Sequence, residues 1–338
     1  MAKLKLVQSN PLGISKDRYD VEKDGVNASL LGRWLSCREY ARLYLLGWTP
    51  KRISAGRVFG SICHDVLDAI YSRIQNGDLD RLPTSDEIRK EIAKFEKKFK
   101  KQNPRADATT LQTLEMNIIL AEAVMPVYFK FWHQDVAKMD WMSLEHKFKS
   151  PIARTHLVGR MDGVFRNLKG KTKKALWLFE TKTKSRMGEH GESSLVDILP
   201  HELQVNLYMG AIAVMYKETP SGLVYNIIRR PGFKLKKNEG PKAYAERVAK
   251  DVSKRPEYYF VRMRMTVEPG DLRRMQQEHE ALVADFTQWA TGRGYHYRNS
   301  GHCENKYGTC EMLSICGRGD YHGFYQRPPR IRKADEEE

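Results

Sequence analysis

The sequence predicts a protein of mixed α/β (α+β) class, with a mixed central β-sheet flanked by helices. Three observations lead to this prediction. Apolar residues recur at helical spacing before Asp140, whereas the segment after it holds short runs rich in aromatic and β-branched residues. Further along, helical and strand patterns alternate. Strands mixed with helices in this order indicate a sheet covered by helices.

Length, charge and hydropathy narrow the class further. The 338 residues suit one core with insertions and flanking helical segments, and a hydrophobic share of 41% suffices for that core. Lys and Arg number 58 against 42 Asp and Glu, and the net charge of +16 favours polyanionic partners. No apolar run approaches the roughly 18 residues that span a bilayer. We therefore expect a soluble protein of the cytoplasm, in a bacterium or a phage-infected host cell, with no membrane partner.

The N-terminal part is predicted to be helical. Apolar residues recur near the helical period over 29–47, where Ser29 suits an N-cap. Further helices are predicted over 56–75, 85–101 and 108–136.

The segment after Asp140 is predicted to supply most of the sheet. Strands are expected over 141–149, 156–165 and 175–183, and the polar linker 167–174, which contains a glycine, suits a hairpin. A helix at 201–216, a strand at 222–229, a helix at 242–251, a strand at 258–266 and a long helix at 271–289 follow.

Acidic and basic side chains stand on two of these strands. Alternation along 176–182 puts Glu180 and Lys182 on one face. The preceding strand carries Arg160 and Asp162 between glycines, and adjacent strands would bring Asp162 and Glu180 together. Two close carboxylates repel unless a cation joins them, so Mg²⁺ or Mn²⁺ is the natural ligand. Such a metal activates water and neutralises phosphate charge, with Lys182 orienting the nucleophile or stabilising the transition state.

An isolated Glu-x-Lys on a strand is usually only a solvated face, so the neighbouring motifs decide. They are, in order, His64 in Gly-Ser-Ile-Cys-His, Asp162 in Gly-Arg-Met-Asp, Glu180-Thr-Lys, and Gln204-Val-Asn-Leu-Tyr208. This series resembles the RecB-like branch of the PD-(D/E)XK nuclease superfamily over about residues 29–316. The resemblance implies a restriction-endonuclease-like core and a metal-dependent deoxyribonuclease.

The resemblance also implies roles for individual residues. His64, Asp162 and Glu180, with the main-chain carbonyl of Thr181, would hold the metal, and Lys182 would be the catalytic lysine. Taken alone, His64 also fits an ordinary helix histidine.

Two further matches belong to the same resemblance. Gln204 and Tyr208 lie one turn apart on a helix and would support the lysine and contact nucleic acid, although they also fit an ordinary amphipathic face. Glu145 lies before the Gly-Arg-Met-Asp strand, where such nucleases often carry an acidic residue.

Four of the five cysteines suggest a second metal centre. Cys303, Cys310 and Cys316 close the chain, and Cys37 lies far upstream. The pattern resembles the iron-sulfur subset of RecB-like nucleases, typified by AddB and the CRISPR-associated enzymes, in which one early and three late cysteines bind a [4Fe-4S] cluster. The spacing departs from the commonest one, where two residues separate the first two late cysteines. Zinc and plain thiols remain alternatives, and Cys63 is interpreted as core packing.

These patterns predict five segments. A nuclease core (141–267) follows an N-terminal extension (1–28) and a helical region with Cys37 and His64 (29–140). A C-terminal helix with the iron-sulfur cysteines (268–320) and a tail (321–338) complete the chain. A metal bound by Cys37 and the three late cysteines would close a very long loop between the two ends of the chain.

Basic side chains are candidates to bind DNA, and aromatic residues among them are candidates to stack on bases. The alternative is that long cations only cover apolar surface. The aromatic candidates are Trp34, Tyr40 and Phe233. The basic candidates are Arg33, Arg38, Arg57, Arg160, Arg229 and Arg230.

Two functions follow from the sequence. The first is a DNA exonuclease of recombination, repair or phage DNA metabolism, acting on single-stranded DNA or DNA ends beside a recombinase, single-strand annealing protein or helicase. The second is a DNA-binding protein that recruits a helicase or recombinase and cleaves little itself. The intact Asp, Glu and Lys favour the enzyme. An exonuclease is expected because the chain shows no base-reading module such as a helix-turn-helix.

Overall fold

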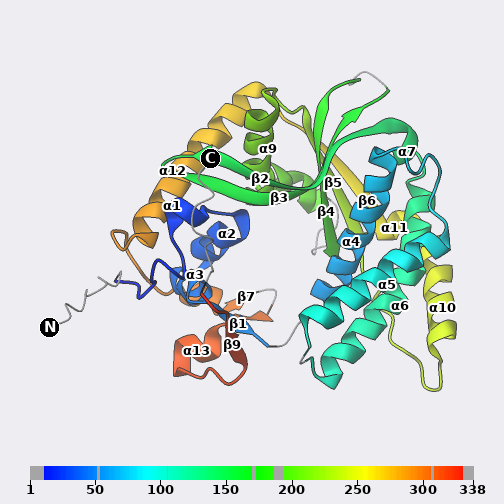
Figure 1. Ribbon diagram of the computed structural model, residues 1–338, viewed down its shortest axis with the longest axis horizontal. Coiled ribbons are helices and arrows are strands. Elements are labelled where there is room, and N and C mark those ends of the chain that lie inside the picture. The colour runs from blue at the N-terminus through cyan, green and yellow to red at the C-terminus, as the bar shows by residue number, and fades with distance from the viewer. Residues whose placement is uncertain are drawn as a thin grey trace. The chain divides into compact units, whose positions relative to one another are not determined.

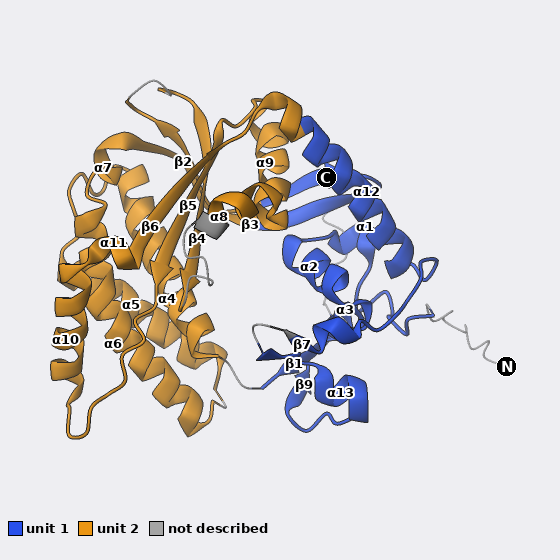
Figure 2. Ribbon diagram, turned by 180° about the vertical axis from the view of Figure 1, so that it is seen from behind, with its two compact units in different colours: residues 1–52, 148–159, 273–338 blue, residues 53–147, 160–272 orange. Residues whose placement is uncertain are grey.

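The computed structural model describes residues 11–51, 54–104, 106–169, 173–185, 193–305 and 308–329 (Figure 1). The chain forms two compact units (Figure 2). Unit 1 comprises Met1–Arg52, Phe148–Gly159 and Arg273–Glu338, and unit 2 comprises Ile53–Lys147 and Arg160–Leu272. Within the described ranges, no helix is both long and apolar enough to cross a membrane.

A five-stranded mixed sheet forms the centre of unit 2, which confirms the predicted fold class. Its strands lie in sequence order: β2 (Met139–Ile152), β3 (Thr155–Asn167), β4 (Leu176–Lys184), β5 (Gly222–Arg229) and β6 (Phe260–Thr266). β4 runs antiparallel to β3 and parallel to β5, and β6 runs antiparallel to β5. The outer ends of β2 and β3, residues 148–159, belong to unit 1.

The parallel pair β4 and β5 is the most deeply buried part of the sheet. Both strands are nearly continuous runs of buried residues, as expected for strands covered on both faces. A parallel connection needs a crossover, which is provided by α8 (Ser193–Ile198), η1 (Leu199–His201) and α9 (Leu203–Tyr216).

A group of helices covers the face of the sheet opposite α9. It contains α4 (Ala55–Gln75), α5 (Ser85–Gln102), α6 (Ala108–Phe131) and α10 (Pro241–Lys254), with α6 in contact with the other three (Figure 1). A capping box between Thr84 and Glu87 begins α5.

Two predicted elements of unit 2 have different bounds in the structure. The helix predicted over 108–136 ends at Phe131, because Trp132 leaves helical geometry (φ −97°, ψ 33°), and a short α7 (Asp135–Lys138) follows. The strand predicted from residue 258 begins at Phe260, because Pro256 starts a helical turn, α11 (Pro256–Tyr259).

Unit 1 gathers short elements from both ends of the chain. They are α1 (Val21–Asp24), α2 (Ala28–Ser36), α3 (Arg38–Leu45), β1 (Trp48–Pro50), most of α12 (Pro269–Ala290), η2 (Ser300–His302), β7 (Glu304–Asn305), β8 (Gly308–Thr309), α13 (Leu313–Arg318) and β9 (Phe324–Gln326). β1 pairs with β9, so the two ends of the chain share one small sheet. β7 and β8 form a hairpin.

The single helix predicted over 29–47 is in fact two helices. Asn27, not Ser29, caps α2, because its side chain accepts a hydrogen bond from the backbone N–H of Leu30. Cys37 adopts an extended conformation (φ −163°, ψ 122°) and separates α2 from α3. Trp34 is 3% exposed and packs against aromatic residues of α12, so it is not available to stack on bases.

Candidate active site

Glu180 and Lys182 project from the same face of β4, as the alternation predicts. The Lys182 ammonium donates a hydrogen bond of 2.6 Å to Glu180 Oε1 and one of 3.0 Å to Gln204 Oε1. Gln204, at the start of α9, in turn donates to the same Glu180 oxygen at 2.7 Å. The three side chains therefore form a closed triangle, and each fixes the orientation of the other two.

The second Glu180 oxygen, Oε2, is buried and has no hydrogen-bond partner among the described residues. Leaving a buried carboxylate oxygen unpaired is costly, so a native protein normally provides a partner for it. Glu180 Oε2 could therefore accept a bond from a donor or a cation.

Asp162 lies on β3, next to β4. The backbone N–H of Thr181 donates to Asp162 Oδ2 at 2.7 Å. On the other side, His64 Nδ1 lies 3.3 Å from Asp162 Oδ1 and 3.9 Å from Glu145 Oε1. One ligand atom from each of His64, Glu145 and Asp162 lies within 4.8 Å of the others, so these three residues could share a metal ion.

Two backbone features allow this approach. Gly60, one turn before His64, lies where a Cβ atom would come within 2.7 Å of Thr183 Oγ1 of β4, so glycine lets α4 come close to the strand. Glu145 adopts a left-handed conformation (φ 43°), which costs energy in a non-glycine residue. Arg160 Nε lies 2.6 Å from Glu145 Oε2 and holds that side chain in place.

The charges at the site are strongly coupled. Burial, and then the neighbouring Asp162, raise the pKa of Glu180 to about 8, while Lys182 opposes the shift. Burial alone would lower the pKa of His64, but Asp162 and Glu145 outweigh it and raise the pKa to about 10. Similarly, Glu180 raises the pKa of Lys182 against the effect of burial. The carboxylates thus attract any nearby cation.

Tyr208, one turn after Gln204 on α9, is buried. It is 6% exposed, its hydroxyl interacts with the backbone of Arg160, and burial raises its pKa to about 12. Tyr208 therefore supports β3 behind the site, whereas Gln204 contacts the lysine directly.

A buried polar network behind Thr181 was not predicted from the sequence. Asn226 of β5 is fully buried and donates from Nδ2 to Thr181 Oγ1 at 3.1 Å. Arg262 Nε donates to Asn226 Oδ1 at 3.0 Å, and the same guanidinium forms 2.6 Å contacts with both oxygens of Asp135. The signal in the sequence was a polar residue within the apolar run 222–228 and an arginine within the strand that follows.

The predicted DNA-binding arginines mostly make local contacts. In unit 2, Arg229 lies over the Tyr258 ring at 4.3 Å, and Arg230 donates to Asn117 at 2.9 Å while burial lowers its pKa. Arg57, in the first turn of α4, is exposed, as is most of the Arg160 side chain.

The two arginine candidates in unit 1 pack on aromatic rings. Arg33 lies over Tyr44 at 4.3 Å, and Arg38 over Trp34 at 4.7 Å. Of the aromatic candidates, Tyr40 donates to Glu311 at 2.5 Å.

The four widely spaced cysteines come together in unit 1. Cys37, Cys303, Cys310 and Cys316 all line one cavity of about 250 Å³. The break between α2 and α3 presents Cys37, and the Cys310 N–H donates to the Cys303 carbonyl at 2.8 Å across the β7–β8 hairpin. Burial raises the pKa of the Cys310 and Cys316 thiols. Cys63 is fully buried in the core of unit 2, as its interpretation as a packing residue requires.

The mixed sheet, with an aspartate, a glutamate and a lysine from adjacent strands, is the arrangement of a nuclease. The chain belongs to the PD-(D/E)XK nuclease superfamily, since the model of this family matches residues 27–317. It is also similar to a solved structure from Eubacterium rectale described as a "putative exonuclease", with a TM-score of 0.49 and 10% identity over 86% of this chain and 92% of that one. No curated protein matches the chain.

Proposed function

We propose that this nuclease is a RecB-like, divalent-metal-dependent deoxyribonuclease that degrades DNA from a strand end. The observation that carries the proposal is the buried Oε2 of Glu180, which has no hydrogen-bond partner among the described residues and lies close enough to Asp162 to feel its charge. A cation bound at both carboxylates would satisfy that oxygen and offset both the burial of Glu180 and the charge of Asp162, which together raise the pKa of Glu180.

The donor atoms suit a hard divalent cation. We assign Asp162, Glu180, His64 and the main-chain carbonyl of Thr181 as ligands of Mg²⁺ or Mn²⁺, which prefer oxygen donors. Glu145 lies beside His64 and Asp162 and is available as a further ligand.

Lys182 and Gln204 have separate roles in this mechanism. When bound, the ion supplies an activated water and positive charge beside the scissile phosphate. A lysine ammonium has three protons, and Lys182 donates two of them to Glu180 and Gln204. The third has no acceptor among the described residues, so it is available to the attacking water or a phosphate oxygen, where it would stabilise the charge that develops.

The absence of a base-reading module in the sequence supports action at strand ends. The excess of Lys and Arg that gives the net charge of +16 suits binding to the phosphate backbone, which does not depend on base sequence. We place the activity in DNA recombination, repair or phage DNA metabolism, beside a recombinase, single-strand annealing protein or helicase.

A cleavage assay on matched substrates tests the proposal. Linear DNA, single- and double-stranded, should be degraded with Mg²⁺ or Mn²⁺ and not with a chelator, while covalently closed circles should survive. Glu180→Ala and Asp162→Ala should each lower cleavage by about three orders of magnitude or more and leave DNA binding nearly unchanged. Equal cutting of circles would replace the exonuclease with an endonuclease. DNA binding without any cleavage would favour the recruiting protein.

We further propose that Cys37, Cys303, Cys310 and Cys316 bind a [4Fe-4S] cluster. A tetrahedral zinc ion with Zn–S bonds of about 2.3 Å needs sulfurs roughly 3.8 Å apart. Within the described residues, the one group of three or more metal-ligating side chains with ligand atoms inside 4.8 Å is that around His64, so no three of the cysteine sulfurs all lie within that distance of one another. Sulfurs that surround a cavity suit a cluster better than a single ion.

A further inference from the structure

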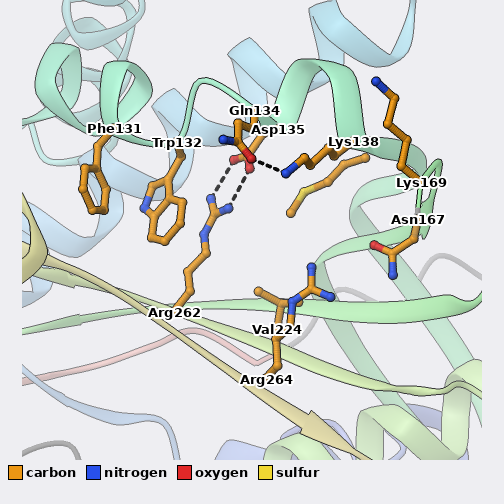
Figure 3. Close-up of a pocket in the computed structure, with 11 residues that line it drawn as sticks. Phe131, Trp132, Gln134, Asp135, Lys138, Asn167, Lys169, Val224, Arg262 and Arg264 are labelled. Atoms are coloured by element: carbon orange, nitrogen blue, oxygen red, sulfur yellow. Dashed lines mark hydrogen bonds and ion pairs between the residues drawn. The ribbon is translucent and has the colours of Figure 1, made fainter. Parts of the chain in front are cut away.

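Unit 2 also contains a pocket whose lining residues include none of Glu180, Lys182 and Gln204. It has a volume of about 590 Å³ and lies between the end of α6, α7, the end of β3 and strand β6 (Figure 3). Val224 forms part of its floor. Tyr225 is the cross-strand neighbour of Glu180, and successive residues of a strand point to opposite faces, so this pocket opens on the other face of the sheet.

The pocket has an excess of positive charge. Four cations line it, Lys138, Lys169, Arg262 and Arg264, against the single carboxylate of Asp135. That carboxylate is already neutralised, because Arg262 contacts both of its oxygens at 2.6 Å and both side chains are only 8% exposed. Figure 3 shows these two groups pointing at each other.

The other three cations have no carboxylate partner among the described residues. Lys138 donates to the neutral side chain of Gln134, Arg264 lies over the Trp177 ring at 5.2 Å, and Lys169 is exposed. Like charges gathered around one concavity repel each other, and a bound anion relieves that repulsion.

The backbone brings these cations together from distant parts of the chain. The N–H of Leu168 donates to the carbonyl of Lys138 at 3.0 Å, which joins the end of β3 to the end of α7. Arg264 is the cross-strand neighbour of Val224. Lys90 and Lys97, by contrast, stand on the exposed face of α5 and line none of the described pockets. Lys138, Lys169 and Arg264 thus differ from these surface lysines because they line a concave site.

One wall of the pocket is aromatic. Phe131 and Trp132 lie in edge-to-face contact at 4.8 Å, and the Arg262 guanidinium lies 4.0 Å from the Trp132 ring. The indole N–H of Trp132 is buried and has no hydrogen-bond acceptor among the described residues. An aromatic wall beside a group of cations matches a ligand with both a planar ring and an anionic group.

We propose that this pocket binds a nucleotide phosphate, with Lys138, Lys169 and Arg264 around the phosphate and Trp132 beside the base. Its volume is within the range of small-molecule sites. The ligand is a nucleoside monophosphate, either free or as the phosphorylated end of a DNA strand. The site is separate from the proposed metal centre and needs no metal.

The test is calorimetric titration of the full chain in EDTA, where the carboxylate site cannot hold phosphate through a metal. The probes are dAMP, deoxyadenosine and a short 5′-phosphorylated oligonucleotide. We expect dAMP to bind and deoxyadenosine not to bind. Lys169→Ala combined with Arg264→Ala should weaken dAMP binding by about tenfold or more, whereas Lys90→Ala combined with Lys97→Ala should leave it unchanged.

The oligonucleotide distinguishes the two sources of the phosphate. If the pocket variant weakens oligonucleotide binding as well, the site takes a strand end, and if it weakens only dAMP binding, the site takes a free nucleotide. Equal affinity of the pocket variant and the lysine control for both probes would overturn the proposal. Repeating the titration with Glu180→Ala should give the affinity of the unmodified chain, so this result does not depend on nuclease activity.

Discussion

At the scale of single residues, the central feature of the candidate site is the set of hydrogen bonds that the Lys182 ammonium donates. Two of its three donors are directed at Glu180 and Gln204, and Gln204 holds the glutamate from the other side. In the proposed mechanism Gln204 is therefore a positioning residue, which would act on the reaction through its hydrogen bonds to Lys182 and Glu180.

Gln204→Ala should lower kcat for DNA cleavage by about 10- to 100-fold, the usual cost of removing a residue that orients a catalytic group. KM should change little, because backbone affinity comes from dispersed cations. Steady-state kinetics on linear DNA measures both, with the exposed Gln112→Ala as control. A raised KM with unchanged kcat would assign Gln204 to DNA binding instead.

The individual site residues differ in how far the sequence could predict them. Glu180 and Lys182 alternate on one short apolar strand, so their shared face followed from local geometry. The contacts of Asn226, Arg262 and Asp135 join three segments far apart in the chain, and no local pattern encodes them. Whether Oε2 of Glu180 has a hydrogen-bond partner likewise depends on side chains from distant segments, and none of the described residues provides one.

At the scale of elements, the sequence predicted the bounds of some helices and strands better than those of others. Strand β5 has the predicted bounds, because its apolar run ends at charged residues. The division at Cys37 could not be predicted, since apolar residues keep the helical period through it. At that residue the folded chain makes contacts with the C-terminal segment, such as the 3.4 Å hydrogen bond from Asn299 N–H to the Cys37 sulfur, and no local pattern encodes them.

The start of α5 offers a test of stability against pH. Hydrogen bonds from Arg81, the Thr84 backbone and Arg73 hold the pKa of Glu87 well below its usual value of 4.5. A depressed pKa stabilises the fold above the unfolded-state value and loses that effect as the pH falls. Glu87→Gln should therefore lower the free energy of unfolding by about 1 kcal/mol at pH 7.

The difference between wild type and Glu87→Gln should shrink as the pH falls below about 4.5. Urea denaturation at several pH values measures it. Glu96→Gln is the matched control, because its pair with Lys100 is on the surface of the same helix and should contribute less. A difference that is constant from pH 7 to pH 3 would mean that the Glu87 charge is not involved.

At the scale of the whole molecule, unit 1 depends on bonds between the two ends of the chain. β1 pairs with β9, and the cysteine cavity combines Cys37 with three residues from beyond position 300. Composition along the chain gives no sign of this division, because it arises from contacts between segments that are distant in sequence.

Anaerobically purified protein should be brown, with broad absorbance near about 400 nm and bound iron and sulfide. Cys316→Ser and Cys37→Ser should each lose the colour and lower the Tm, because a ligand joining both chain ends is removed. Cys63→Ala should lose stability but keep its iron, since Cys63 lies in the other unit. Colourless protein that contains zinc, or no metal apart from the proposed Mg²⁺ or Mn²⁺, would exclude the cluster.

The division of the chain has a consequence for how the protein is made. Every segment of unit 2 has been synthesised once Leu272 has left the ribosome, whereas unit 1 still lacks the stretch that starts at Arg273. Domains fold as units during synthesis, in the order in which their residues emerge. The sheet with Asp162 and Glu180 can therefore form early. The cavity that contains Cys37 cannot form until the last three cysteines have been synthesised. Assembly of the proposed cluster on those cysteines would then be a late step, after unit 2 has folded.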